Sequence, residues 1–269
     1  STKYLGKEFD IHGGGMDLQF PHHECEIAQS TVCNHQMPAR YWLHNNMITI
    51  NGKKMGKSYN NVIKLSELFA GTHPILEQAY APSTVRFFIL QSQYRSTLDF
   101  SNEALQASEK ALRRLMDAYE WFMSFDLTAN QTGDDQTLNQ KVVKLVTEFD
   151  EFMNDDINTA KVIANMFELV PVINSLKDKH ISATALDSNT IDLMKKQLSA
   201  FIVDIFGLQS SKADNNNKLE GVLQLLINIR KEAKQRKDFV TSDKIRNELS
   251  ALGVQLKDEK DGGMSYTIQ

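Results

Sequence analysis

The chain has 269 residues and a formal net charge of −4, from 30 Lys plus Arg and 34 Asp plus Glu. This net charge excludes a uniformly basic nucleic-acid coat protein, but it does not exclude a local basic patch. A hydrophobic fraction of 41% excludes wholesale disorder, and no apolar run approaches the roughly 18 residues that a membrane span needs. Two cysteines, Cys25 and Cys33, are too few for a disulfide framework and suit a reducing, cytoplasmic compartment.

The first unusual segment, residues 12–17 (HGGGMD), follows a short apolar stretch. Consecutive glycines let a ligand approach the backbone, and a carboxylate such as Asp17 just beyond them can bind a ribose hydroxyl. On its own, a glycine triplet is more often only a turn. Alternating residues at 41–43 and 47–50 then predict strands, and Asn51-Gly52 predicts a turn after the second of them.

Pro21 predicts the start of a helix, because proline is favoured in the first helical turn. His22 and Glu26 lie four residues apart and therefore project from one face of that helix. An imidazole and a carboxylate suit zinc, but a zinc site needs three or four ligands. Neither Cys25 nor Cys33 complements the pair, so a surface His–Glu pair is the alternative.

Residues 53–58 (KKMGKS) follow the predicted turn. Lys54 and Lys57 flank a flexible Met-Gly pair and can neutralise a polyphosphate during phosphoryl or nucleotidyl transfer. Any exposed loop can carry lysines, so a solvated loop is the alternative here.

From Ser101 onward the apolar period becomes helical. Ser101 is expected to cap a first helix, and a second helix is expected at about 137–153. The segment 155–158 (DDIN) can cap a third helix, and residues 188–206 are expected to form a fourth, so an antiparallel bundle is predicted. The residues expected on the core-facing stripes of the first and third helices are Ala104, Ala107, Ala111, Leu115, Ala118, Ala160, Ile163, Ala164, Phe167 and Val170.

A polar segment at 209–217 (QSSKADNNN) predicts a linker, and a small unit follows it. A first helix is expected with Leu219, Val222, Leu223 and Leu226 on one stripe. The cationic residues of that region, for which a solvated helix face is the simplest interpretation, are Arg230, Lys231, Lys234, Arg236 and Lys237. The second helix is expected to start at Thr241 or Ser242, with Ile245, Leu249 and Leu252 inward and Gly253 as its stop. A hairpin around Gly262-Gly263 closes the unit.

Taken together and in this order, the motifs resemble one family. The matching runs are FDIHGGGMDLQFPHHECEIAQS, YWLHNNMITINGKKMGKS, VRFFILQSQYRSTLDFS, NDDINTA and KDFVTSDKIRNELSALGVQLKDEKDG. They resemble the cysteinyl-tRNA synthetases, which are class I aminoacyl-tRNA synthetases, over essentially the whole chain. The resemblance implies a mostly α fold with a partial Rossmann-type α/β catalytic part, a helical bundle and a small α+β anticodon-binding domain. The expected division is 1–65 catalytic, 66–100 connecting, 101–208 bundle, 209–217 linker and 218–269 anticodon-binding.

The resemblance implies a cysteine–tRNA ligase whose N-terminal half is absent from this chain, so that this piece alone is expected to be inactive. Its zinc would be held by His22 and Glu26 with two upstream cysteines, and would bind the substrate thiolate. ATP with Mg²⁺ would be a substrate. The residues matching the nucleotide-binding and catalytic motifs are His12, Gly13, Gly14, Gly15, Asp17, Lys54 and Lys57. Gly56 stands where the family usually has Ser.

The implied partners are tRNA-Cys, L-cysteine and ATP, with no membrane and a monomeric chain. The residues matching the anticodon domain are Lys234, Phe239, Asp243 and Arg246. Phe239 stands where Trp is common and could stack on a base, the alternative being a core contact with Leu252 or Tyr266.

Two other functions share features of the chain. A ligase joining activated cysteine to an amino sugar lacks an anticodon domain, and a non-catalytic RNA-binding protein would not need Lys54, Lys57, His22 and Glu26.

Overall fold

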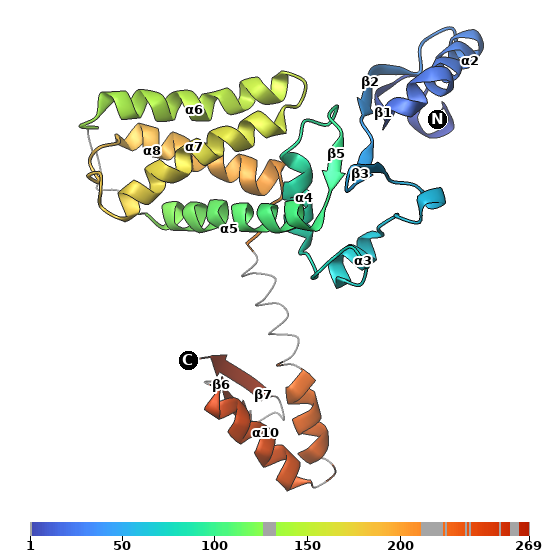
Figure 1. The fold of residues 1–269 in the computed structure, drawn as a ribbon. Helices are drawn as coiled ribbons and strands as arrows, with labels where there is room; N and C mark the ends of the chain where they lie inside the picture. Colours follow the sequence, from blue (N-terminus) through green and yellow to red (C-terminus); the bar gives the residue numbers. More distant parts are fainter. Residues whose placement is uncertain are drawn as a thin grey trace. The chain divides into compact units, whose positions relative to one another are not determined.

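The structure is a computed structural model, which describes residues 2–125, 133–210, 223, 225–234, 236, 238–252, 254–258 and 264–268. The chain divides into two compact units, residues 1–210 and residues 211–269. Helices dominate the first unit and a few short strands accompany them (Figure 1). The mostly α fold with a partial α/β part is therefore confirmed. Residues 211–217 of the linker expected at 209–217 lie outside the described residues, and the finer domain boundaries stay predictions.

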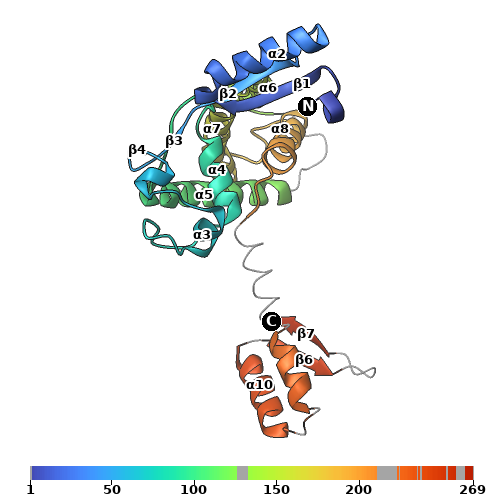
Figure 2. The ribbon, with the colours of Figure 1, turned by 90° about the vertical axis from the view of Figure 1, so that its right-hand side faces the viewer.

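A short helix, α1 (Thr2–Leu5), precedes a βαβ unit made of β1 (Phe9–Gly15), α2 (Glu24–Asn34) and β2 (Ala39–Asn45). The two strands pair in parallel, and α2 lies along them in Figure 2. The strand predicted at 41–43 is confirmed within β2. Phe20 is extended, and the helical backbone starts at Pro21, as predicted; its first residues belong to a π-helical turn, Gln19–His23, which continues into α2 at Glu24.

The next layer of the first unit is a three-stranded sheet in the order β4-β3-β5, formed by β3 (Ile48–Ile50), β4 (Lys53–Lys54) and β5 (Leu98–Phe100). Asn51 and Gly52 both have positive φ, 50° and 74°, so the predicted tight turn is confirmed. The Asp99 carboxylate accepts hydrogen bonds from Thr49 Oγ1 at 2.6 Å and from the Gly52 amide at 2.8 Å. This carboxylate therefore fixes the turn that precedes residues 53–58, which we call the lysine segment.

Two helices, α3 (Leu65–Ala70) and α4 (Pro82–Leu90), connect β4 to β5. They pack on the sheet through a small core, whose buried residues are Ile50, Leu68, Leu76, Tyr80, Val85, Phe88, Phe100 and Leu105. The core ties the lysine segment to the first bundle helix, because Leu105 belongs to that helix.

The bundle consists of α5 (Asn102–Ser124), α6 (Gln136–Asn154), α7 (Thr159–Lys177), α8 (Ser188–Ser199) and a π-helical continuation, Ala200–Ile205. The N-cap predicted at Ser101 is confirmed, because Ser101 Oγ accepts from the Ala104 amide at 3.1 Å. Within the predicted capping segment 155–158, Asn158 is the cap, and its Oδ1 accepts from the Lys161 amide at 3.2 Å. These bonds satisfy amide groups that a helix start leaves unpaired. The fourth predicted helix is correct in extent, although its last turn is π-helical.

The core-facing stripes predicted for the bundle are partly wrong. Ala107 on α5 and Ala164 on α7 are exposed, whereas neighbouring larger residues face inward. The inward residues of these two helices include Leu105, Leu112, Leu115, Phe122, Val162, Met166, Leu169 and Ile173. Burying a leucine or phenylalanine removes far more apolar surface from water than burying an alanine. The helices are therefore rotated toward the larger side chains.

The second unit contains a helical stretch at 225–234, α10 (Phe239–Ala251), β6 (Val254–Asp258) and β7 (Met264–Ile268). The strands pair antiparallel with Val254 opposite Ile268, so the predicted hairpin is confirmed. Helix α10 begins earlier than predicted, because Asp238 Oδ1 accepts from the Thr241 amide and acts as N-cap. These hydrogen bonds from Thr241 hold the pKa of Asp238 below its ordinary value.

Two expectations for this unit are wrong. Leu252 is 78% exposed rather than inward, since the helix ends at Ala251 and Leu249 takes the buried place. Arg230 is only 1% exposed and so does not belong to a solvated basic face, while Lys231 and Arg236 do. Other predicted positions lie outside the described residues, namely Leu219, Val222, Lys237, Gly253 and Gly262-Gly263.

None of the helices in the described part of the chain combines the length and apolarity required to cross a bilayer.

Tyr80 tests the packing between the connecting segment and the bundle. Its buried hydroxyl donates to Asn102 Oδ1 at 2.7 Å, an oxygen that also accepts from the Glu77 amide. We expect Tyr80→Phe to lower the free energy of unfolding by about 1–2 kcal/mol, because one buried hydrogen bond is lost. Urea denaturation measures this, and Tyr59→Phe at an exposed tyrosine is the control. Equal stability of the two variants would contradict this role.

Candidate functional site

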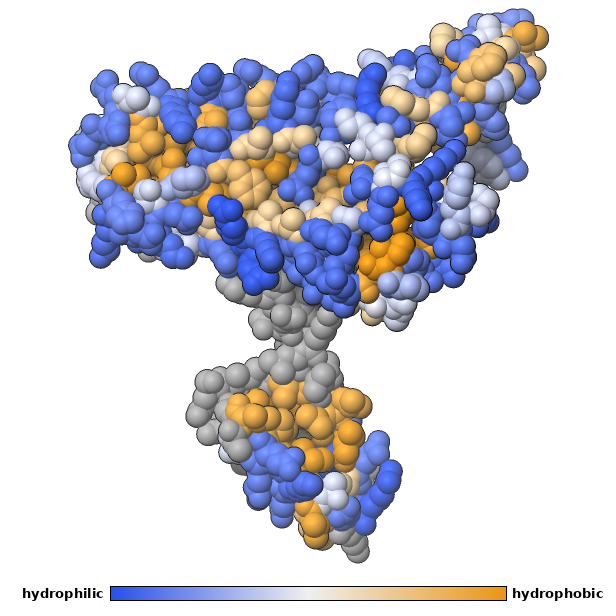
Figure 3. All heavy atoms as spheres, viewed as in Figure 1, coloured by the Kyte–Doolittle hydropathy of each residue, from blue (hydrophilic) through white to orange (hydrophobic). Residues whose placement is uncertain are grey.

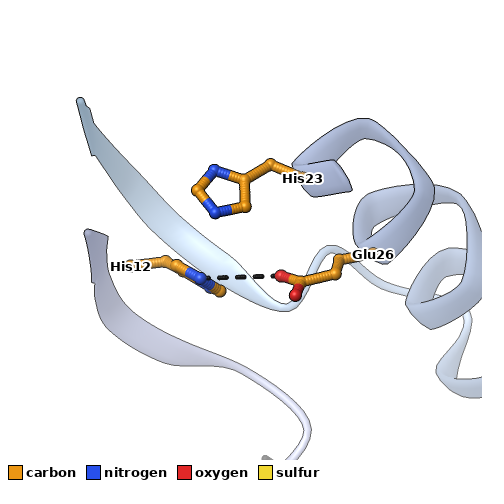
Figure 4. Close-up of side chains that lie close together, drawn as sticks. All are labelled: His12, His23 and Glu26. Carbon is orange, nitrogen blue, oxygen red and sulfur yellow. Dashed lines mark ion pairs between the residues drawn. The ribbon is translucent and has the colours of Figure 1, made fainter. Parts of the chain in front are cut away.

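Three side chains from different elements converge beside the βαβ unit: His12 from β1, His23 from the turn before α2, and Glu26 from α2 (Figure 4). His12 Nε2 lies 3.5 Å from Glu26 Oε2. One potential ligand atom of each residue lies within 4.8 Å of those of the other two. The cluster thus offers two imidazoles and one carboxylate, a donor set that zinc accepts.

Aromatic rings position the imidazoles of this cluster. The His12 ring stacks on Trp42 of β2, with centroids 4.4 Å apart and an interplanar angle of 16°. His23 Nδ1 lies 2.9 Å from His44 Nε2, so one proton is shared between these two rings. Burial and then the neighbouring His12 lower the pKa of His23, against an opposing effect of Glu26. His23 is therefore held toward its neutral form.

Gly14 makes the position of His23 possible. A Cβ at residue 14 would lie 2.7 Å from His23 Cε1 and 3.1 Å from His23 Nε2. A side chain at this position would therefore overlap the imidazole and force it to move. The glycine that the sequence assigns to ligand approach therefore has a second role, which is to admit the ring of the buried histidine.

The predicted metal pair is brought together as the helical spacing implied. His22 Nε2 lies 3.6 Å from Glu26 Oε1, and His22 is 65% exposed at the ring. The imidazole and carboxylate are zinc donors, and they fit the ion as two ligands of a larger set. Cys25 and Cys33 are exposed free thiols, and neither belongs to the cluster.

The sequence analysis missed His23, His44 and Trp42. The signal that could have found two of them is the two-residue alternation in β2, which puts Trp42 and His44 on one face of the strand. In the parallel register, His12 lies opposite Trp42 and Gly14 opposite His44. The burial of His23 depends on this pairing, which the sequence does not state.

The residues predicted to bind nucleotide divide between two places. A cavity of about 260 Å³ is lined by nine residues, Gly15, Met16, Asp17, Asn45, Asn46, Met47, Ile48, Lys54 and Met55. Gly15, Asp17 and Lys54 of the predicted set therefore meet at one cavity. His12 faces the histidine cluster instead, and Lys57 does not line the cavity.

The lysine segment is held at its base by Asn61. The Asn61 side chain donates to the Lys54 carbonyl at 3.1 Å and accepts from the Gly56 amide at 2.9 Å. Lys57 starts a short 3-10 turn, Lys57–Tyr59, and its side chain is exposed. The φ of Gly56 is −171°, an extended conformation that any residue can adopt, so the backbone does not require glycine there.

The predicted anticodon residues lie on the second unit. Phe239 is 62% exposed, so the alternative in which it packs into a core is wrong. Asp243 and Arg246 form an ion pair of 3.3 Å with each other, and Lys234 is partly buried. Apolar residues gather on the viewed face of this unit in Figure 3. Its exposed large apolar side chains are Leu225, Ile229, Phe239, Val240 and Leu252.

Two family models match the chain. Residues 1–110 match the model described as tRNA synthetases class I (C) catalytic domain, and residues 148–210 match the DALR domain. The chain is 48% identical over 262 residues to a cysteine–tRNA ligase of Cytophaga hutchinsonii, covering 97% of this chain and 52% of that protein. A cysteine–tRNA ligase of Parabacteroides distasonis is 49% identical over 263 residues, with the same coverage. The chain thus spans about half the length of the curated relatives it matches.

Among solved structures, the LeuRS of Agrobacterium radiobacter K84, in a ternary complex with tRNA and LeuAMS, aligns with a TM-score of 0.49 at 14% identity. The alignment covers 74% of this chain and 25% of that one.

Gly14 provides a direct test of the histidine cluster. We expect Gly14→Ala to lower the free energy of unfolding by roughly 1–3 kcal/mol, the usual cost of an overpacked site, because the methyl group would overlap the His23 ring. Gly13→Ala is the matched control, since its Cβ would meet only the Leu43 carbonyl oxygen at 3.9 Å. Urea denaturation of both variants provides the comparison. If Gly14→Ala is as stable as Gly13→Ala, His23 does not occupy this position in solution.

Proposed function

We propose that this chain, whose predicted resemblance to class I cysteinyl-tRNA synthetases is confirmed by the matches above, forms about half of an ATP-dependent cysteine–tRNA ligase. The complete protein would activate cysteine as its adenylate and then transfer it to tRNA-Cys. One observation carries the proposal: Gly15 and Asp17 of one motif of the resemblance and Lys54 of another line a single cavity. The strand β1 supplies Gly15 to this cavity and His12 to the histidine cluster. A nucleotide in the cavity would therefore lie next to a cysteine bound at the cluster.

The nucleotide would be bound by groups of different chemistry. Asp17 can accept hydrogen bonds from a ribose, and the glycines of β1 let the nucleotide approach the backbone. Lys54 at the cavity and Lys57 on the adjoining turn would neutralise the phosphates, with Mg²⁺ accompanying ATP. Lys57 would have to move toward the cavity, which its exposed place after an extended glycine permits.

His22 and Glu26 would provide half of a zinc site, and two cysteines from the other half of the ligase would complete it. When bound, zinc would select a thiolate over a hydroxyl, because the thiolate is the softer of the two ligands and zinc prefers it. His12 Nε2, which lies 3.5 Å from Glu26 Oε2, would stay beside this carboxylate in the zinc site. We expect the isolated chain to be inactive, since it offers only part of both sites.

The second unit would contact the anticodon of tRNA-Cys. Its exposed Phe239 could stack on a base, and Lys234 could neutralise a phosphate. The Asp243–Arg246 pair lies about one turn further along α10, and it could open to present either charge to a base edge. A cytoplasmic, monomeric ligase is part of the same proposal.

The proposal is tested by two assays on the complete protein. We expect pyrophosphate exchange that depends on cysteine, and charging of transcribed tRNA-Cys with cysteine. Exchange without charging, with transfer to an amino sugar instead, would point to the other class of cysteine ligase. Neither reaction would mean that the motifs serve a non-catalytic RNA-binding protein.

Lys57 is the sharpest probe of the adenylation step. In the complete protein we expect Lys57→Ala to slow cysteine-dependent pyrophosphate exchange about 10²- to 10³-fold, because one positive charge near the transition-state phosphates is lost. The control is Lys53→Ala, an exposed lysine on β4 outside the cavity. Cysteine binding should stay the same in both variants. An unchanged exchange rate in Lys57→Ala would reject this role.

Phe239 separates tRNA recognition from adenylation. A stacked base contributes about 1–3 kcal/mol, so Phe239→Ala should raise the KM for tRNA-Cys roughly 5- to 150-fold and leave pyrophosphate exchange intact. The neighbouring Val240, which is also exposed, supplies the control Val240→Ala. A parallel fall in both activities would identify Phe239 as a structural residue.

A further inference from the structure

One carboxylate at the corner between α6 and α7 is bound by three consecutive residues of another segment. Asp156 Oδ1 accepts from the Tyr94 hydroxyl at 2.6 Å and from Arg95 Nη2 at 3.2 Å. Asp156 Oδ2 accepts from Gln93 Nε2 at 3.1 Å and lies 2.8 Å from Arg95 Nε. The hydrogen bond from Tyr94, followed by the contacts of Arg95, lowers the pKa of Asp156. We name Gln93, Tyr94, Arg95 and Asp156 the corner clamp.

The backbone of the corner clamp also forms the support of the cavity wall. The Asn46 amide donates to the Tyr94 carbonyl at 2.9 Å, and Asn46 Nδ2 donates to the Arg95 carbonyl at 2.9 Å. Asn46 lines the cavity together with Asp17 and Lys54. Tyr94 and Arg95 therefore contact the bundle through their side chains and the cavity wall through their backbone carbonyl groups.

The bundle side of the clamp is itself held firmly. Asp156 has a φ of 59°, in the left-handed region that Asp and Asn tolerate better than most residues. The corner is closed by the Asn158 amide bonding to the Phe152 carbonyl at 2.9 Å. Thr159 Oγ1 then donates to the Leu90 carbonyl at 2.7 Å, at the end of the helix that leads into the clamp. A displacement of the α6–α7 corner would therefore be passed to residues 93–95.

We propose that Asp156 is a positioning residue, which fixes the cavity wall at Asn46 to the helical bundle through Gln93, Tyr94 and Arg95. The position of the wall then depends on the corner of the bundle, about 110 residues away in sequence. That the cavity binds the nucleotide of ATP rests on the proposed function; the mechanical link between Asp156 and Asn46 does not.

Hydrogen exchange on this chain tests the link itself. The variant is Asp156→Asn, which tolerates the same backbone conformation but turns an amide group toward the donors of Gln93 and Arg95. The matched control is Asp155→Asn, the preceding residue, whose carboxylate lies 3.6 Å from the exposed Lys161 and is not part of the corner clamp. We expect faster exchange of the Asn46 amide in Asp156→Asn and wild-type exchange in Asp155→Asn. Equal exchange in both variants would overturn the proposal.

Kinetics of the complete protein test the consequence for the cavity. We expect Asp156→Asn to raise the KM for ATP in pyrophosphate exchange about 2- to 30-fold, the usual range for residues in a coupling network, with kcat nearly unchanged. Tyr94→Phe, which removes one of the hydrogen bonds, should give a smaller change in the same direction. A fall in kcat alone, at constant KM, would overturn the positioning role. If the wild-type protein shows no pyrophosphate exchange, the proposed function fails. Faster hydrogen exchange of the Asn46 amide in Asp156→Asn would still support the mechanical link.

Discussion

The parallel pairing of β1 with β2 determines where every group of the histidine cluster lies. Because side chains alternate along a strand, His12 and Gly14 share a face of β1, and their partners Trp42 and His44 share the same face of β2. The crossover through α2 then brings His23 and Glu26 over this face. A shift of β2 by one residue relative to β1 would turn Trp42 and His44 to the opposite side of the sheet, away from His12 and Gly14. The cluster is thus a consequence of strand register more than of any single contact.

A different device positions the lysines, which lie where regular structure ends. The tight turn at Asn51 and Gly52 is fixed by Asp99, and the segment after β4 is joined at its base by Asn61. Both lysine side chains are exposed, but Lys54 lies in β4 and lines the cavity, whereas Lys57 lies beyond the bond from the Gly56 amide to Asn61 and does not line it. The backbone of Lys54 is therefore held by β4 and by Asn61, while Lys57 lies beyond this hydrogen bond.

Local chemistry made the helix caps, the tight turn and the hairpin predictable from sequence. Ser101 and Asn158 cap helices because their side chains reach amides three residues on, whatever the rest of the fold does. The facing of the helices was less predictable, because alanine and leucine stripes run side by side on α5 and only packing decides between them. The buried Arg230 and the exposed Leu252 were likewise mispredicted, since their surroundings come from other segments.

The same distinction applies to the candidate site. The His22–Glu26 pair follows from helical spacing and was predicted, while its metal-binding role stays a prediction. The approach of Gly15, Asp17 and Lys54 to one cavity required the resemblance, because no local pattern joins residues 15 and 54. His23 could not be separated from its exposed neighbour His22 by sequence, since only the space left by Gly14 admits one of them to the interior.

The burial of His23 has a consequence for what the cluster can do. A lowered pKa keeps the ring neutral, so one of its nitrogens carries a proton and the other a lone pair. If Nδ1 donates its proton to His44, the lone pair lies on Nε2, and His23 can serve as a ligand beside His12 and Glu26. If His44 donates instead, Nε2 carries the proton and becomes a hydrogen-bond donor to the carboxylate. The tautomer of His44 therefore decides whether the Nε2 atom of His23 offers a lone pair or a hydrogen bond to Glu26.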